Sequence, residues 1–306
     1  MPLRIVFLGT PDFAVESLRA IINNSFDVVA VVTAPDKPAG RGMKLQYSPV
    51  KKTALEHNIP VLQPTNLKDP AFIEELRTFN ADLQVVIAFR MLPEKVWNMP
   101  KLGTVNLHAS LLPDYRGAAP INWAIINGEK ESGVCTFFLK HEIDTGNIIL
   151  KESYPISENT TAGELHDALM HLGAKIIVKT LELIKNNNYT LTPQGNSSPN
   201  KVAPKIFTET CRINWNLEGK QINQLIRGLS PYPGAFTSFH EKILKVFDAH
   251  FILDQNQTEI PGTIKIVKDV SLMIACKNGW MELLEVQLEG KKRMRIGDFV
   301  RGLRAN

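Results

Sequence analysis

Residues 4–33 hold two short apolar runs on either side of an amphipathic segment, and this pattern restricts the fold more than any other feature. The runs are RIVFLG at 4–9 and DVVAVVT at 27–33, and both are rich in β-branched residues. The segment between them repeats apolar residues at helical spacing, with Thr10 or Asp12 as the expected N-cap. A strand, a helix and a second strand form a right-handed parallel unit by default. We therefore expect an α/β fold built on a parallel sheet.

The same alternation continues along the chain. Apolar runs at 83–89, 104–109 and 133–140 predict further strands, and residues 161–186 predict a long amphipathic helix. The resulting picture is a Rossmann-like, mostly parallel sheet with flanking helices.

The first strand-to-helix turn argues against a dinucleotide cofactor. It reads GTPDFA, so Pro11 and Ala14 stand where a GxGxxG turn has its later glycines. Without those glycines the backbone cannot approach a pyrophosphate closely. We expect neither a nicotinamide nor a flavin cofactor.

A change in composition divides the chain. Residues 1–190 form the expected catalytic domain, and the amide-, Ser- and Pro-rich residues 191–205 are typical of a linker. Residues 206–306 hold short strand-like runs separated by turns. This pattern predicts a smaller β-barrel domain at the C-terminus.

Composition limits the environment and the cofactors. The three cysteines, Cys135, Cys211 and Cys276, are far apart and lack metal-binding spacing, which indicates a reducing compartment and no metal. No apolar run approaches the ~20 residues of a membrane span, and the N-terminal apolar run is too short for a secretion signal. We expect a cytoplasmic protein that does not enter membranes. Nothing in the sequence requires an oligomer, so we expect a monomer.

Asn106 and His108 form the candidate catalytic pair. They alternate with Val105 and Leu107 in a short strand, so their side chains should share one face. An amide can stabilise an oxyanion while an imidazole either shares that oxyanion or moves the proton, which suits attack on a carbonyl carbon. The end of a parallel strand is also where open α/β sheets bind ligands. A packed, hydrogen-bonded histidine without a catalytic role is the simpler alternative.

The neighbouring sequence favours chemistry. A turn with Ser110, Pro113, Arg116 and Gly117 follows the pair, and an isolated Asp144 follows later in IDTGNII. A serine hydrolase using Ser110, His108 and Asp144 is an alternative, although no GxSxG turn exists.

A basic segment precedes the second predicted helix. PDKPAGRGMK carries Lys37, Arg41 and Lys44, and the C-terminal tail is also basic. The net charge of +4 permits an anionic partner without proving one. The segment is either a solvated loop or an arm that contacts phosphates. A non-catalytic RNA-binding protein is therefore a third functional class.

Several of these motifs together resemble the methionyl-tRNA formyltransferases, within the wider family of folate-dependent formyltransferases. They are VFLGTPDFAVESL, PDKPAGRGMKLQYSPVK, VNLHASLLPDYRGAAPINWAI, IDTGNII and SPYPGAF, which are spread over nearly the whole chain. The resemblance implies a Rossmann-like domain followed by an OB-fold-like barrel that binds tRNA. It also implies transfer of a formyl group from 10-formyltetrahydrofolate to the α-amino group of methionyl initiator tRNA, for translation initiation.

By this resemblance, Asn106, His108 and Asp144 are the catalytic residues. Ser110, Leu111, Leu112 and Pro113 match the turn that contacts the folate, and Lys37, Arg41 and Lys44 belong to the loop that contacts the tRNA. Another folate-dependent formyltransferase, acting on glycinamide ribonucleotide or an amino sugar, is the alternative within the family.

Two positions depart from the family pattern. Arg90 and Glu142 stand where members commonly have glycine. We expect the two side chains either to pair across the mouth of the folate pocket or to change its shape.

Overall fold

The computed structural model describes residues 2–39, 44–195, 201–267 and 270–304. They form two compact units. The first contains residues 1–117, 132–154 and 166–201, and the second contains residues 118–131, 155–165 and 202–306. The chain therefore enters the second unit twice before it stays there.

A seven-stranded sheet forms the centre of the first unit, in the order β10-β9-β7-β6-β1-β2-β5. Its strands are β1 (Arg4–Gly9), β2 (Asp27–Val32), β5 (Val61–Leu62), β6 (Leu83–Ile87), β7 (Thr104–His108), β9 (Glu131–Phe138) and β10 (Ile148–Pro155). The five strands from β5 to β7 are parallel, whereas β9 runs antiparallel to β7. The predicted Rossmann-like, mostly parallel sheet is confirmed.

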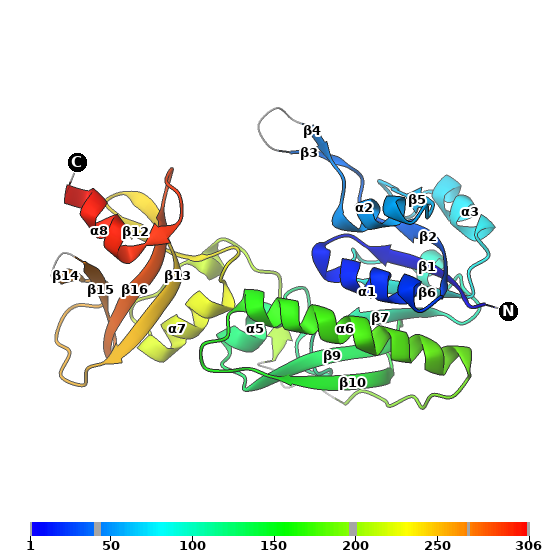
Figure 1. Cartoon of the computed structure of the whole chain (residues 1–306). Coiled ribbons are helices and arrows are strands. Elements are labelled where there is room, and N and C mark those ends of the chain that lie inside the picture. Colours follow the sequence, from blue (N-terminus) through cyan, green and yellow to red (C-terminus); the bar gives the residue numbers. More distant parts are fainter. Residues whose placement is uncertain (1, 40–43, 196–200, 268–269, 305–306) are drawn as a thin grey trace. The chain divides into compact units, whose positions relative to one another are not determined.

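Helices cover both faces of this sheet. They are α1 (Asp12–Asn23), α2 (Pro49–Glu56), α3 (Pro70–Thr78), α4 (Glu94–Trp97) and α6 (Ala162–Lys185). In Figure 1, α1 and α6 lie along one face of the sheet. Residues of α3 and α4 pack on the other face, against apolar side chains of β1, β2 and β6.

The N-cap of α1 differs from the prediction. Pro11 occupies that position, and no side chain donates or accepts a capping hydrogen bond. Thr10 lies one residue too early, and Asp12 lies in the first turn, where its negative charge faces the positive end of the helix dipole. The predicted cap at Thr10 or Asp12 is therefore wrong.

A short hairpin interrupts the connection between β2 and α2. Strands β3 (Lys37–Ala39) and β4 (Lys44–Gln46) pair antiparallel with each other and with no other described strand. In Figure 1 this hairpin projects from the body of the first unit beyond α2. The sequence pattern indicated only a loop here.

An antiparallel sheet forms the centre of the second unit, as expected for a β-rich C-terminal domain. It contains β12 (Ala235–Phe239), β13 (Lys242–Leu253), β16 (Gly279–Leu288), β15 (Ser271–Cys276) and β14 (Ile264–Val267), in that order, with β17 (Met294–Arg295) pairing with β16. The other elements of this unit are α5 (Pro120–Ile126), β11 (Val202–Ala203), a 3₁₀ turn (Glu209–Cys211), α7 (Gly219–Gly228) and α8 (Ile296–Arg304), whereas the short β8 (Arg116–Gly117) belongs to the first unit. Helices α7 and α8 bury apolar residues against the sheet.

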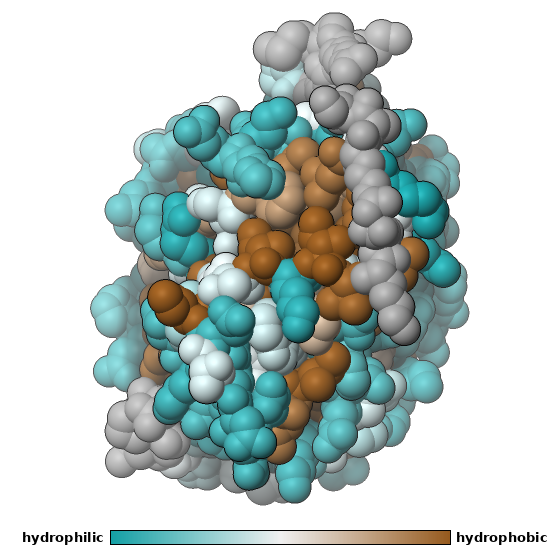
Figure 2. Space-filling model, turned by 90° about the vertical axis from the view of Figure 1, so that its left-hand side faces the viewer, coloured by the Kyte–Doolittle hydropathy of each residue, from teal (hydrophilic) through white to brown (hydrophobic). Residues whose placement is uncertain are grey.

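Part of the surface of the second unit is apolar. Figure 2 shows apolar side chains gathered on the face that it draws, among hydrophilic ones. On β14, Ile264 and Ile266 are exposed. Val270, just before β15, and Leu284 of β16 are exposed as well. No helix among the described residues has both the length and the apolar character to span a membrane.

Candidate active site

Strand β7 brings Asn106 and His108 to one face of the sheet. Asn106 lies beside Val86 of β6, and His108 lies opposite Cys135 of β9. The intervening Leu107 points the other way, toward α6, where a Cβ on Gly173 would lie 2.7 Å from its side chain. The alternation read from the sequence therefore predicts correctly that the amide and the imidazole share a face.

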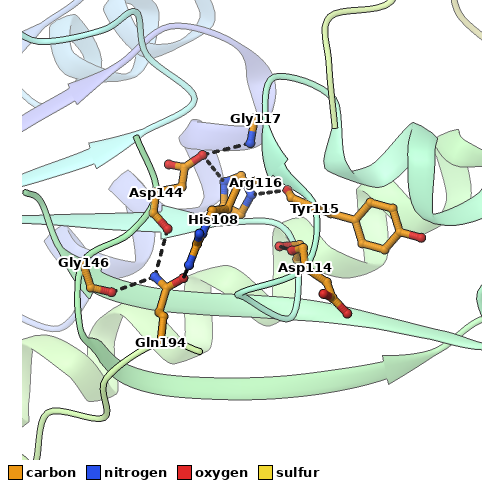
Figure 3. A network of polar contacts seen from close by, with 9 residues as sticks. His108, Asp114, Tyr115, Arg116, Gly117, Asp144, Gly146 and Gln194 are labelled. Carbon is orange, nitrogen blue, oxygen red and sulfur yellow. Dashed lines mark hydrogen bonds and ion pairs between the residues drawn. The ribbon is translucent and has the colours of Figure 1, made fainter. Parts of the chain in front are cut away.

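His108 is held by one ring nitrogen and presents the other. Its side chain is almost fully buried, and Nε2 lies 2.9 Å from the carbonyl oxygen of Tyr115. A carbonyl oxygen only accepts, so Nε2 carries the hydrogen and donates it. Nδ1 then faces Asp144, whose Oδ2 lies 3.9 Å away (Figure 3). That separation exceeds a hydrogen bond, so the two groups attract each other as a close pair of charges when the ring is protonated.

The position of Asp144 is set by contacts on both sides of it. Its Oδ2 accepts a hydrogen bond of 3.0 Å from the backbone N–H of Gly117. Its backbone has a φ of +53°, which is uncommon for a residue with a side chain. No side chain fits at Gly146, two residues later, because an added Cβ would lie 1.7 Å from the carbonyl oxygen of Phe138.

Gln194 fastens the loop that carries Asp144. Its Nε2 donates to the carbonyl oxygens of Asp144, at 2.9 Å, and Gly146, at 2.7 Å. Its Oε1 accepts from Arg116 through Nε at 3.1 Å and Nη2 at 2.7 Å (Figure 3). Sequence reasoning missed Gln194, which lies in the segment predicted as a linker. No spacing or motif connects it to Asp144, fifty residues earlier.

Asn106 is available to a ligand. Its side chain is partly buried. Among the residues that the structure describes, none forms a hydrogen bond with the Asn106 side-chain amide. An amide in this state, on the same face as His108, fits a ligand that brings a carbonyl oxygen.

Neither of the two possible nucleophiles near His108 is ready to attack a substrate. Ser110 is fully buried and its Oγ donates to the carbonyl oxygen of Asp114 at 2.7 Å, so it is not aligned on the imidazole. Burial raises the pKa of the Cys135 thiol to about 12, which keeps it protonated at neutral pH. This arrangement disfavours the serine-hydrolase alternative.

The turn predicted to contact folate is only partly accessible. Leu112 is fully buried and packs with Phe137 and Ile148, so it supports the turn from inside and offers no surface to a ligand. Leu111 and Pro113 are half-buried, and the Leu112–Pro113 peptide bond is cis.

Two of the three predicted tRNA-contacting residues, Lys37 and Lys44, lie in the strands of the hairpin. Lys37 is exposed on β3 and Lys44 belongs to β4. Arg41 falls outside the described residues.

Arg90 does not pair with Glu142. Its Nη1 donates to the carbonyl oxygen of Thr65 at 2.9 Å, and its Nη2 donates to that of Pro64. Arg90 thus stabilises the segment after β5. The expectation that Arg90 pairs with Glu142 across the mouth of the folate pocket is wrong. Among the described residues no group of three His, Cys, Asp or Glu side chains is arranged to hold a metal ion.

Known proteins are similar to this chain in sequence and in fold. Residues 3–181 match the formyl transferase family, and residues 205–304 match the formyl transferase C-terminal domain. The chain is 50% identical to the methionyl-tRNA formyltransferase of Bacteroides thetaiotaomicron, over 99% of this chain and 96% of that protein. It is 51% identical to the enzyme of the same name from Flavobacterium johnsoniae, over 98% and 96% of the two chains.

Solved structures agree on the fold at lower identity. An N-formyltransferase from Helicobacter canadensis, in complex with folinic acid and dTDP-3-aminofucose, has a TM-score of 0.69 at 22% identity and covers 94% of this chain and 100% of its own. HypX from Aquifex aeolicus, in complex with tetrahydrofolic acid, has a TM-score of 0.64 at 18% identity over 98% of this chain. The chain spans about half of HypX, 47% of its length. On the extent and identity of these matches, the chain belongs to the formyl transferase family, alongside the methionyl-tRNA formyltransferases.

Proposed function

We propose that the chain transfers a formyl group from 10-formyltetrahydrofolate to the α-amino group of methionine carried by initiator tRNA. The names of relatives at about 50% identity over nearly the full chain support this substrate pair. The observation that carries the chemistry is the convergence of Asn106, His108 and Asp144 from β7 and the loop before β10. Formylated methionyl-tRNA serves translation initiation.

The formyl donor supplies a carbonyl carbon that the amino nitrogen attacks, with the folate nitrogen as the leaving group. Asn106 donates from its unpaired amide to the formyl oxygen, on which negative charge gathers. A donor placed in this way lowers the barrier by about 2.7–4 kcal/mol. The half-buried Leu111 and Pro113 form the wall against which the folate binds, and the buried Leu112 supports them.

His108 moves the proton through Nδ1, because Nε2–H is committed to the carbonyl oxygen of Tyr115. In the neutral ring Nδ1 holds a lone pair and accepts a proton from the attacking amine. The resulting imidazolium then returns that proton to the leaving nitrogen.

Asp144 stabilises the imidazolium as it forms. Its Oδ2 is 3.9 Å from Nδ1 and is already fixed by Gly117 N–H, so little reorganisation is needed. The carboxylate favours the charged ring by direct attraction.

The hairpin and the second unit supply the surface for the tRNA. Lys37, Arg41 and Lys44 are assigned to contact the acceptor end of the tRNA. In the basic tail, Arg293 and Arg301 are already paired with Glu285 and Asp298, so the exposed Lys291 and Lys292 contribute more to phosphate attraction. The proposal includes that the protein is a monomer and that it acts in the cytoplasm, where charged tRNA is found.

The test offers labelled 10-formyltetrahydrofolate to the purified protein with methionyl initiator tRNA, glycinamide ribonucleotide or an amino sugar nucleotide. We expect label on the tRNA, and loss of that label with His108→Ala. Label on a small amine but not on the tRNA would overturn the tRNA assignment. Tight tRNA binding without any transfer would favour the non-catalytic RNA-binding class.

A further inference from the structure

A network of charged and polar groups lies at the root of the β3–β4 hairpin. Asp36 immediately precedes β3, and Tyr47 immediately follows β4. Between these two residues lies Lys51 of α2, whose Nζ is 2.5 Å from Asp36 Oδ2 and 4.0 Å from the centre of the Tyr47 ring. One side chain therefore contacts both ends of the hairpin.

Gln63 ties this network to the sheet. It directly follows β5, its Oε1 accepts from Lys51 Nζ at 2.7 Å, and its Nε2 donates to Asp36 Oδ1 at 2.8 Å. The same Nε2 lies 2.8 Å from the carbonyl oxygen of Ala34. The hairpin root is thus joined to the ends of β2 and β5.

Further hydrogen bonds strengthen the same region. Thr33 Oγ1 and Ser48 Oγ are 2.8 Å apart, and Ser48 caps α2 by accepting from Lys51 N–H at 3.1 Å. Arg90 holds the carbonyl oxygens that follow Gln63.

The hairpin needs an external anchor. Each of its strands has three residues, and its only described strand partner is the other strand. An isolated two-stranded hairpin is at best marginally stable in water, so its own pairing fixes its direction poorly. The ion pair beneath it differs from an ordinary surface pair, because only 13% of Lys51 and 18% of Asp36 side-chain surface is exposed.

We propose that Lys51 is a positioning residue that fixes the direction of the β3–β4 hairpin, and so sets the affinity for the tRNA acceptor. This inference rests on the proposed function, in which the hairpin contacts tRNA. Lys51 acts through Asp36 and Tyr47 and does not bind phosphate, because its ammonium group is already engaged by Asp36, Gln63 and the Tyr47 ring.

The experiment compares Lys51→Met with Lys52→Met in the full-length protein. Both changes remove one lysine charge from α2, but Lys52 is exposed and has no ion pair among the described residues. Lys51→Arg restores a cation that can pair with Asp36 and stack on Tyr47. Tyr47→Leu, at a side chain 45% exposed, is a second variant in case Lys51→Met does not fold.

The first measurement is amide hydrogen exchange at Lys37, Ala39 and Lys44–Gln46, without tRNA, since Pro38 has no amide hydrogen. We expect exchange at least tenfold faster in Lys51→Met and Tyr47→Leu, wild-type exchange in Lys52→Met, and partial recovery in Lys51→Arg. Unchanged exchange in both Lys51→Met and Tyr47→Leu would overturn the anchoring role, whatever the protein formylates.

The second measurement is formyl-transfer kinetics. We expect the KM for methionyl-tRNA to rise about tenfold in Lys51→Met, with kcat and the KM for the folate unchanged. A general loss of stability would change all three. Faster exchange with an unchanged tRNA KM would overturn the link to the acceptor, whereas a wild-type protein that does not formylate tRNA would overturn the proposed function instead.

Discussion

Nδ1 of His108 faces Oδ2 of Asp144 at 3.9 Å, while the opposite ring nitrogen is held by the Tyr115 carbonyl oxygen. This arrangement leaves one nitrogen for proton transfer and places a fixed negative charge beside it. The imidazole is thereby oriented before any substrate binds.

Replacing Asp144 by asparagine tests the value of that charge. The amide oxygen can still accept from Gly117 N–H, so the loop should keep its position while the imidazolium loses its counter-charge. We expect kcat to fall by about 10²- to 10⁴-fold, the range typical of acid–base catalysis. Glu142→Gln, at an exposed carboxylate two residues earlier, is the control and should keep wild-type kcat. An Asp144→Asn enzyme with near-normal kcat would remove Asp144 from the mechanism.

Asn106 and Ser110 distinguish formyl transfer from serine-hydrolase chemistry. Asn106→Ala removes the proposed oxyanion donor, and we expect kcat to fall by about 10²- to 10³-fold. Ser110→Ala removes a hydrogen bond to the Asp114 carbonyl oxygen and should leave most of the activity. Steady-state kinetics of both variants check this. The opposite ranking would support Ser110 as a nucleophile.

Gln194→Ala should release the loop that carries Asp144. The change removes the donors to the carbonyl oxygens of Asp144 and Gly146 and the acceptor for Arg116. Because small displacements of catalytic groups are costly, we expect kcat to fall by up to about 10²-fold. Asn147→Ala, in the same loop and bonded only to the exposed Lys140 side chain among its described partners, is the matched control. Equal effects of the two changes would contradict a specific role for Gln194.

The contrast between Asn106 and Gln194 shows how far the sequence determines the site. The shared face of Asn106 and His108 was predictable, because strand alternation is a local rule that places residues two apart on one face. Gln194 was not predictable, because its contacts depend on where a segment without regular structure crosses the Asp144 loop. The β3–β4 hairpin was missed for a related reason. Its strands are only three residues long and contain a proline, so they have no readable period.

Asp36 gives a prediction for the dependence of stability on pH. Hydrogen bonds from Lys51 and then Gln63 hold the pKa of its carboxyl below the ordinary value of 3.8. A carboxyl whose pKa is lower in the folded state stabilises the fold fully above its unfolded pKa, and this stabilisation disappears as the pH falls through the folded pKa. Asp36→Asn should therefore lower the denaturation midpoint by a constant amount between about pH 5 and pH 7.

Below about pH 4 the difference between wild type and Asp36→Asn should shrink, because the wild-type carboxyl then becomes neutral as well. Urea denaturation across this range measures it. Asp298→Asn is the control, since Asp298 pairs with Arg301 while both side chains are at least 60% exposed, and such surface pairs contribute little at any pH. A difference for Asp36→Asn that stays the same down to pH 2 would show that the change acts through packing. In that case the negative charge of Asp36, which pairs with Lys51, would contribute nothing to the stability of the fold.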